Sequence, residues 1–294
     1  MTDARPSNDN DKTGDALSEQ RFSMLSDIAR ELSSDIVFPT YFDAILRLRQ
    51  ALENPDLSLT DIGKIIALDP LISAKLLHMA NSAAFNSAGR PVVELKTAVA
   101  MLGLTTVRST AMAIAMRQLM RAKSLAQFAS TMQLLWEHTI RCSAAARVLA
   151  EKLTRVNPDE AMLAGLIHDL GAFYMLYRAT QYEELRNRPD SLRHLILHWH
   201  ESIGISLLTA LGLPDEIVNA TAEHDRPRLL PSPPSSLHDI IYIANLLAGS
   251  QREWLQEMDD ATLKLQQEAK TRFQEFLPDI EAITDELQRT LKGD

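Results

Sequence analysis

Residues 164–176, with the sequence AGLIHDLGAFYML, place the strongest constraint on how this chain can fold. Their apolar residues recur at helical spacing, yet the stretch carries His168 and Asp169 side by side. Burying a histidine and a carboxylate in an apolar helix costs several kcal/mol unless each is hydrogen-bonded, paired or bound to a metal. The fold therefore has to supply partners for this pair, by capping a neighbouring helix, in a buried polar network or at a metal site.

The composition is typical of a helical protein. Glycine accounts for 10 of 294 residues, which is about 3% against a usual ~7%, and aromatic residues make up 5%. Alanine, leucine and methionine, which are all good helix formers, are plentiful. Apolar residues keep a helical period through most of the chain, and no segment has the alternation and length of a confident β-strand. We therefore predict an all-α fold of one large or two ordinary domains.

Charge and cysteine content disfavour several classes of protein. A net charge of −9 disfavours nonspecific binding to nucleic acid, whose phosphates attract basic surfaces. The single cysteine, Cys142, cannot form an intrachain disulfide, which fits a reducing compartment. Residues 1–20 lack the apolar run of a signal peptide, and Arg108 interrupts the apolar region 98–116. We therefore expect a soluble cytoplasmic protein without a membrane span.

The N-terminal segment is predicted to hold a polar tail followed by short helices. Residues 1–19 are polar and charged, and we interpret them as a disordered tail. Helices are expected over 19–32 and 41–53. The segment 35–39 between them should be extended, because a residue that precedes a proline avoids the helical region.

Two short helices are predicted to meet at Asp69 and Pro70. Asp69 is suited to cap the second helix and Pro70 to open it, while Ser58 or Thr60 is suited to cap the first. Two helices meeting in this way could form a helix-turn-helix. The second helix, however, carries only one lysine and one histidine as basic or proton-accepting groups, a poor footprint for phosphates. We therefore do not expect DNA binding.

A glycine is predicted to divide the apolar region that follows. Asn81 and Ser82 end the preceding helix, and their side chains are expected to hydrogen-bond its terminal carbonyls or a neighbouring loop. Gly103 then separates a helix over 93–101 from one that begins at residue 105 or 106 and runs to about residue 120.

The histidines of the second half lie in apolar surroundings on several predicted helices. One long helix is expected over 125–153, a polar, arginine-rich connector over 181–190, and a further helix over 237–247. The histidines in these surroundings are His138, His168, His198, His200 and His224.

The C-terminal stretch after Trp254 is predicted to be helical and amphipathic, with an interruption near Pro278. Its apolar residues need a partner surface, and we expect them to pack on the protein's own helices. An exposed stripe would instead indicate a dimer or effector contact. These residues are Leu255, Met258, Leu263, Phe273, Phe276 and Leu277.

Five residues of metal-ligand type lie on four separate predicted segments, and the histidines are spaced so that each interval spans about one helical hairpin. Imidazole nitrogen and carboxylate oxygen suit iron, manganese or zinc better than calcium, and the lack of cysteine ligands argues against a structural zinc site. A lone histidine of this kind is more often part of a core, whereas convergence of all five would be unusual by chance. The candidate ligands are His138, His168, Asp169, His200 and His224.

The chain resembles the HDOD branch of the HD superfamily of metal-dependent phosphohydrolases, a bacterial signalling module. The resemblance spans about residues 34–250 and rests on SSDIVFPT, IIALDPLISAKLLHMANSAAF, TAVAMLGL, WEH, AGLIHDLG, HESIG and LGLPDEI. It implies an all-helical HDOD domain over 20–250, with an N-terminal helical subdomain at 34–120 and a degenerate HD-type subdomain at 121–250. Residues 251–294 would then form C-terminal amphipathic helices.

The resemblance also implies a metal site. His138 matches the first histidine of the HD proteins, and His168 with Asp169 matches the pair that gives them their name. His200 matches a further histidine of the HD-GYP branch, which cleaves cyclic dinucleotides. His224 matches the second of two adjacent histidines in that branch.

Several positions depart from the enzymatic pattern. Asn245 stands where the last HD aspartate is expected and is a further candidate ligand, but its neutral amide loses a charge interaction of about 4 kcal/mol at 4 Å. HD-GYP enzymes place a lysine where this chain has Ala172, and EHDRP at 223–227 replaces the GYP segment. Glu223, which stands where that branch has a histidine, is an extra candidate ligand. The hydrolytic equipment is therefore incomplete, and the site is either a degenerate metal centre or holds no metal.

These features bear on three functions. We expect first an HDOD-type signalling protein, catalytically weak or inactive, that binds a partner protein or a nucleotide. The alternative is a metal-dependent phosphohydrolase, in which an acid such as Glu223 would position the attacking water. A DNA-binding regulator is disfavoured by the negative charge. A homodimer through the C-terminal helices is a further expectation, and no catalytic residue is assigned.

Overall fold

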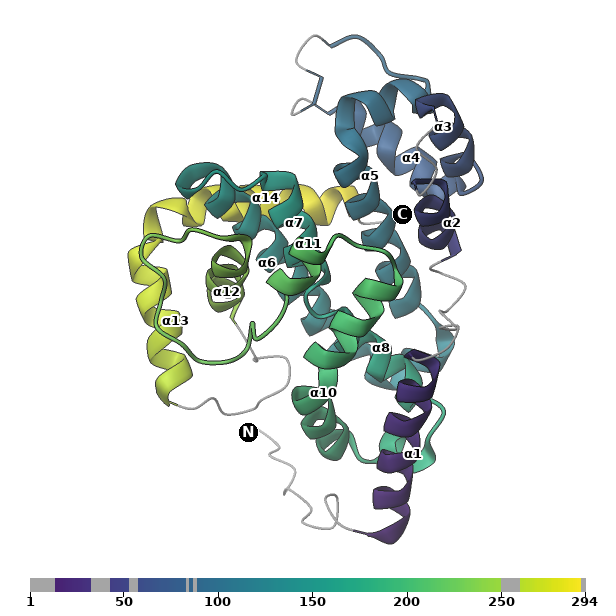
Figure 1. The fold of residues 1–294 in the computed structure, drawn as a ribbon, viewed down its shortest axis with the longest axis vertical. Coiled ribbons are helices and arrows are strands. Elements are labelled where there is room, and N and C mark those ends of the chain that lie inside the picture. The colour runs from purple at the N-terminus through teal and green to yellow at the C-terminus, as the bar shows by residue number, and fades with distance from the viewer. Residues whose placement is uncertain are drawn as a thin grey trace, which may run out of the picture.

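The computed structural model describes residues 14–32, 43–52, 58–82, 85–86, 89–249 and 260–291, and every regular element within these ranges is a helix (Figure 1). The predicted all-α fold is therefore confirmed. The α-helices are α1 Asp15–Leu32, α2 Asp43–Leu52, α3 Leu59–Ile66, α4 Pro70–Ala80, α5 Leu95–Met120, α6 Ala129–Leu153, α7 Pro158–Ile167, α8 Leu170–Ala179, α9 Glu183–Asn187, α10 Pro189–Ala210, α11 Asp215–Ala220, α12 Leu237–Ala248, α13 Asp260–Arg272 and α14 Leu277–Leu291.

The helices form two groups that share α5. Helices α2, α3 and α4 pack against α5 in the upper right of Figure 1, and α5 continues downward to contact α7. In the second group α6 packs against α7, α12 and α14, while α8 packs against α10. The division into subdomains at residue 120 and the other predicted domain boundaries stay predictions.

Helix α5 is bent at the predicted glycine. Gly103 has φ 77° and ψ 159°, a conformation outside the helical region that glycine adopts at little cost. The helix also has the length and apolarity of a membrane span, but 67% of its most apolar window is buried against the rest of the protein. This burial is what a core helix of a folded domain shows.

Capping side chains lie at the ends of the short helices where the sequence predicts them: Ser58 and Asp69 begin α3 and α4, and Asn81 ends α4. Ser58 Oγ accepts a hydrogen bond from the Asp61 backbone N–H at 3.3 Å, and Asp69 Oδ1 accepts from two backbone N–H groups of α4 at 3.0 Å each. Asn81 joins the end of α4 to the following loop: its amide donates to Leu77 O at 2.8 Å and Val92 O at 2.7 Å. These local hydrogen bonds satisfy backbone groups that helix ends leave unpaired.

Some helix boundaries differ from the predictions. Helix α1 begins at Asp15, inside the segment predicted as a tail. Leu17 is fully buried there, and burial of its side chain stabilises this first turn. The predicted helix over 125–153 begins with a 3-10 turn at Lys123–Phe128, and the predicted connector at 181–190 contains α9 and the start of α10. Residues 1–13 and the predicted extended segment 35–39 lie outside the described residues.

The C-terminal helices pack on the protein's own surface. Helix α13 contacts α12, and α14 contacts α6 and α4. Phe273 is buried, and Phe276 and Leu277 pack against the core, which confirms that part of the prediction, whereas Leu263 is 47% exposed. The helix break lies at the 3-10 turn Gln274–Phe276, so that Pro278 sits in the first turn of α14. Leu255 and Met258 lie outside the described residues.

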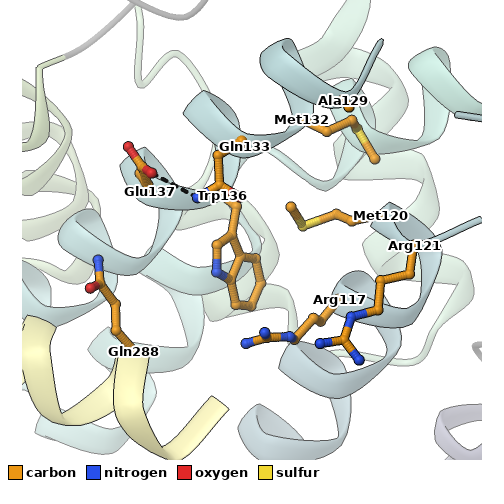
Figure 2. A pocket seen from close by; sticks show the side chains of 9 residues that line it. All are labelled: Arg117, Met120, Arg121, Ala129, Met132, Gln133, Trp136, Glu137 and Gln288. Carbon is orange, nitrogen blue, oxygen red and sulfur yellow. Dashed lines mark hydrogen bonds between the residues drawn. The ribbon is translucent and has the colours of Figure 1, made fainter. Parts of the chain in front are cut away.

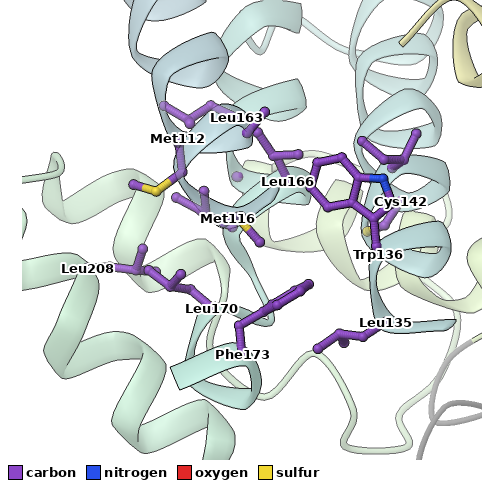
Figure 3. Close-up of a cluster of buried hydrophobic side chains, with 14 of the residues drawn as sticks. Met112, Met116, Leu135, Trp136, Cys142, Leu163, Leu166, Leu170, Phe173 and Leu208 are labelled. Atoms are coloured by element: carbon purple, nitrogen blue, oxygen red, sulfur yellow. The ribbon is translucent and has the colours of Figure 1, made fainter. Parts of the chain in front are cut away.

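One apolar core runs beneath the junction of α7 and α8. Figure 3 shows side chains of α5, α6, α7, α8 and α10 meeting there. Such packing holds the helix ends in fixed positions, because a close-packed interior resists displacement. The labelled members are Met112, Met116, Leu135, Trp136, Cys142, Leu163, Leu166, Leu170, Phe173 and Leu208.

The close contact of α8 with α10 depends on Gly171. A Cβ atom at this position would lie 2.0 Å from the His200 carbonyl oxygen and 2.6 Å from the Gly204 nitrogen, both of them backbone atoms that cannot move aside. We expect Gly171→Ala to destabilise the protein by about 3 kcal/mol or more, as overpacking against backbone does. Urea unfolding would measure the change.

Gly204→Ala is the matched control. Its Cβ atom would come no closer than 3.4 Å to Gly171, which is ordinary van der Waals contact. Equal stability of the two variants would contradict the packing explanation.

Candidate metal centre

His168 and Asp169 lie at a break between two helices. His168 is the C-cap of α7, and Asp169, with φ −99° and ψ 16°, precedes α8 without capping it through its side chain. The prediction of one continuous helix over 164–176 is therefore wrong at this pair. The break turns both side chains toward the same interior point, which two successive residues of a straight helix could not do.

Three further histidines converge on the pair from separate elements. His138 comes from α6, His200 from α10 and His224 from the turn that follows α11. All are buried, with His138 the most accessible at 6%. His138 Nε2 lies 3.1 Å from His168 Nε2, and His200 Nε2 lies 3.3 Å from His224 Nε2. The histidines are therefore arranged as two pairs.

The carboxylate of Asp169 lies between the two pairs. Its Oδ2 is 3.1 Å from His168 Nε2 and 3.6 Å from His138 Nε2. Its Oδ1 is 3.2 Å from His224 Nε2 and 3.5 Å from His200 Nε2. Although both oxygens are fully buried, neither receives a hydrogen bond of good geometry from the described residues. A buried carboxylate in this state needs a positive partner, which a protonated His168 beside Oδ2 or a metal ion held by these nitrogens would supply.

Hydrogen bonds on the outer side of the rings fix which nitrogen faces the centre. The Nδ1 atoms of His168, His200 and His224 lie 2.8, 2.9 and 2.8 Å from backbone carbonyl oxygens of the preceding turn. Because a carbonyl oxygen can only accept, each Nδ1 donates. In a neutral ring the Nε2 then carries the lone pair, which is the arrangement of a metal-binding histidine.

The electrostatics of the cluster attract positive charge. Burial lowers the pKa of His168, but the Asp169 charge and Cys142 outweigh it and hold this pKa well above its ordinary value. Burial and the neighbouring His168 lower the pKa of His138 to about 4. Burial raises the pKa of Asp169, yet the field of His168 overcomes this effect and keeps the pKa well below the usual range. Protons and metal ions would compete for the same nitrogens.

The donor atoms fit two adjoining ion positions. Within each of two groups the ligand atoms lie no more than 4.8 Å from one another. Donors that bind one ion at about 2.1 Å each are separated by at most about 4.2 Å, so small rotations complete either site. The cluster is thus compatible with divalent metal, and Asp169 is shared. The groups are His138, His168 and Asp169, and Asp169, His200 and His224.

Comparison with known proteins identifies the family of the chain. The family profile of the HDOD domain matches residues 38–227, well over half of the chain. The chain belongs to the HDOD family. This match extends from the segment before α2 to the turn that carries His224, so it includes the first helix group and the second as far as α11, without α12 and α14.

Solved structures share the fold along nearly its whole length. A protein from Shewanella amazonensis SB2B, which its name proposes to be a metal-dependent phosphohydrolase, is 25% identical with a TM-score of 0.68, covering 93% of this chain and 100% of its own. An HDOD domain protein of unknown function from Geobacter sulfurreducens is 19% identical with a TM-score of 0.55, covering 92% and 99%.

A sequence relative is longer than this HDOD protein. An uncharacterized protein of Treponema pallidum (strain Nichols) is 26% identical over 211 residues, which is 67% of this chain and 39% of that relative. The aligned region is therefore less than half of the relative's length.

The structure separates the predicted site residues into three kinds. The five predicted ligands come together, and Asn245 lies at their edge, donating to the His224 carbonyl oxygen at 2.9 Å. Glu223 does not belong to the cluster: its side chain is exposed and pairs with Arg226 at 2.8 Å. It adopts φ 52°, so the turn directs its side chain outward while the next residue points inward. His198 is likewise exposed, and its ring contacts that of His194 at a tilt of 54°.

Two carboxylates near the cluster were missed by the sequence analysis. Asp225 Oδ2 lies 3.7 Å from His200 Nε2, and Glu201 Oε1 lies 3.5 Å from His224 Nδ1. Burial raises the pKa of Asp225, but His224 and His200 lower it further than burial raises it. Each acid directly follows a cluster histidine in the sequence, and this adjacency was the available signal.

One surface cavity reaches the cluster at His138, and a second cavity adjoins the first. A cavity of about 460 Å³ is lined by His138, Arg141 and residues of α14. Arg141 is exposed and makes no hydrogen bond or ion pair within the part of the chain that the structure describes. The second cavity, of about 360 Å³, shares Glu137 and Gln288 with the first. His138 is therefore the cluster residue nearest to solvent.

The second cavity is basic and partly aromatic. Figure 2 shows the Arg117 and Arg121 guanidinium groups on one side of the Trp136 ring and Gln288 of α14 on the other. The Arg117 side chain also donates to the Leu291 carbonyl oxygen. Helix α14, which lies outside the matched HDOD region, therefore forms a wall of both cavities.

His168→Ala should remove metal from the centre. Loss of the imidazole removes one metal donor and also the side chain that contacts both His138 and Asp169. We therefore expect metal affinity to fall by more than about tenfold. Elemental analysis of purified protein dialysed against manganese, iron or zinc would measure the content per chain.

His198→Ala is the matched control on α10, because its ring lies outside the cluster. Its metal content should equal that of the wild type, and equal loss in both variants would argue against this centre. Circular dichroism would verify that both variants are folded.

Proposed function

We propose that this HDOD protein is a signalling module that holds divalent metal in the cluster and binds a phosphate-bearing ligand, such as a nucleotide, beside it. The observation that carries the proposal is the Asp169 carboxylate, buried between two histidine pairs with no hydrogen bond to either oxygen from the described residues. Nitrogen and oxygen donors in this mixture suit iron, manganese or zinc. The residues that would hold the metal are His138, His168, Asp169, His200 and His224.

The adjoining cavities support a phosphate-bearing ligand. Arg141 stands next to His138 at the cavity wall, and its guanidinium can bind two phosphate oxygens at once. Arg117 and Arg121 add positive charge in the second cavity, in a protein whose net charge is −9. A ligand with two separated anionic groups would match this distribution.

Phosphate-ester hydrolysis is the second candidate function. It is favoured by the position of Asp169 between two ligand groups, since paired metal ions supply activation of water and neutralisation of phosphate charge. The protein offers little for proton transfer, however. Ala172 is buried and apolar, and Glu223 is exposed and paired with Arg226. Glu201 is occupied by the Asp225 backbone N–H.

We therefore expect little or no hydrolysis of cyclic dinucleotides or of a generic phosphodiester such as bis(p-nitrophenyl) phosphate. Loss of one well-placed stabilising group typically lowers a rate by about a hundredfold. The assay would use purified protein with added manganese or iron. Turnover that His168→Ala abolishes would contradict this expectation, whereas turnover that survives the substitution would indicate a contaminating enzyme.

Arg141→Gln should weaken phosphate binding. Removing a guanidinium that contacts phosphate costs about 1.5–3 kcal/mol, so we expect binding of inorganic phosphate or pyrophosphate to metal-loaded protein to weaken at least roughly tenfold. Isothermal titration calorimetry would measure it. Arg155→Gln, an exposed arginine just beyond the end of α6, is the control and should bind like the wild type.

How the bound state is passed on to other proteins is a separate question. A partner protein that senses the ligand-bound state, a homodimer through the C-terminal helices and a cytoplasmic location are expectations from the sequence. Comparing partner capture and molar mass by light scattering, with and without bound metal, would test the first two.

A further inference from the structure

The turn after α11 brings a second carboxylate against the metal-facing side of the histidines. Asp225 Oδ2 lies 3.7 Å from His200 Nε2, and the side chain is only 11% exposed. Two donors of one ion can be separated by up to about 4.2 Å, so this distance allows Asp225 and His200 to share an ion. Asp225 stands just outside the tighter group of Asp169, His200 and His224.

The five-residue cluster has too little negative charge to neutralise a buried divalent ion, and a second carboxylate would add it. Histidines bind metal as neutral ligands, so Asp169 supplies a single negative charge for an ion of charge +2 in a buried site. Glu201 contacts His224 at Nδ1, the nitrogen that donates to a backbone carbonyl and faces away from the cluster. Asp225 instead approaches Nε2 of His200, the nitrogen that faces the centre.

Asn245 holds Asp225 in this position. Its Nδ2 donates to Asp225 Oδ1 at 3.0 Å and to the His224 carbonyl oxygen at 2.9 Å, and the residue is fully buried. Glu201 Oε1 accepts from the Asp225 backbone N–H at 3.2 Å. Oδ1 of Asp225 is thus hydrogen-bonded to Asn245 of α12, while Oδ2 lies toward His200.

The chemistry of residue 245 suits holding a carboxylate better than binding a cation. An amide has hydrogens to donate to Asp225, whereas an ionised carboxylate can only accept. An aspartate at 245 would face the Asp225 carboxylate with like charge and would leave the His224 carbonyl oxygen without this donor. Asparagine is therefore the residue that allows Asp225 to stay ionised and turned inward.

We propose that Asp225 is a metal-binding carboxylate of the His200–His224 half of the centre, and that Asn245 is the positioning residue that orients it. The ligand class is a divalent cation that accepts mixed nitrogen and oxygen donors. Manganese and iron fit this donor set better than ions that favour nitrogen donors alone. The inference rests on the metal centre of the proposed function. It differs from the sequence-based assignment, in which Asn245 itself was a candidate ligand.

Manganese binding to the full metal-stripped chain tests the proposal. Isothermal titration calorimetry gives affinity and stoichiometry, and the electron paramagnetic resonance spectrum of bound Mn²⁺ reports its ligand environment independently of any activity. Asp225→Asn should weaken the binding of one ion at least tenfold and change the spectrum. Glu223→Gln, which removes an exposed acid two residues earlier, should bind like the wild type.

Asn245→Asp separates the two roles of residue 245 by the sign of its effect. If Asn245 orients Asp225, the substitution removes its donors, adds a repelling charge and weakens manganese binding at least tenfold. If residue 245 is itself the ligand, the added charge tightens binding, and that result would overturn the proposal. Urea unfolding of the metal-free variants shows whether a loss of affinity exceeds any loss of stability. Asp225→Ser serves as the substitute should Asp225→Asn not fold.

The outcomes distinguish this inference from the function on which it rests. A wild-type protein that takes up no manganese, iron or zinc would overturn both. A wild-type protein that binds metal while Asp225→Asn binds it equally well, with an unchanged spectrum, would overturn this inference alone and leave the five-residue centre intact.

Discussion

The arrangement of this protein depends on the burial of one carboxylate. Asp169 is withdrawn from water at the junction of α7 and α8, where an unpaired charge would cost many kcal/mol. Four imidazoles approach its two oxygens from three other segments and from its neighbour His168. Because each approach must be accurate to a fraction of an ångström, α6, α7, α8, α10 and the turn after α11 have little freedom to move independently.

The apolar core and the glycines provide that accuracy. Gly165 lies against the backbone of α6 at Cys142 and Ser143, and Gly171 lies against α10 at His200. Such contacts allow helix axes to approach more closely than side chains would permit, and close packing then keeps them in place. The polar centre and the apolar core are therefore interdependent. The core sets the distances between the histidines and Asp169, and the centre gives these buried polar side chains their partners.

On the proposed function, the centre would let an HDOD protein hold metal with little or no hydrolysis. Binding requires donors, charge and burial, all of which this chain has. Hydrolysis further requires a group that transfers protons at the reacting atoms, and Ala172 and the outward-facing Glu223 do not provide one. A metal that is bound without turnover can instead shape the cavity beside His138 into a phosphate site, and α14 then forms part of its wall.

The sequence by itself determined the features that arise from neighbouring residues. The helical fold, the Asp69 cap and the break at Gly103 follow from backbone hydrogen bonding and conformational preferences within a few positions. The ligand-type residues were visible because histidine and aspartate are conspicuous in apolar helices. Only the tertiary structure decided that His168 and Asp169 flank a break, that Glu223 faces solvent and that Asp225 faces His200. These outcomes depend on the direction of side chains in packed helices distant in sequence, which residue spacing does not encode.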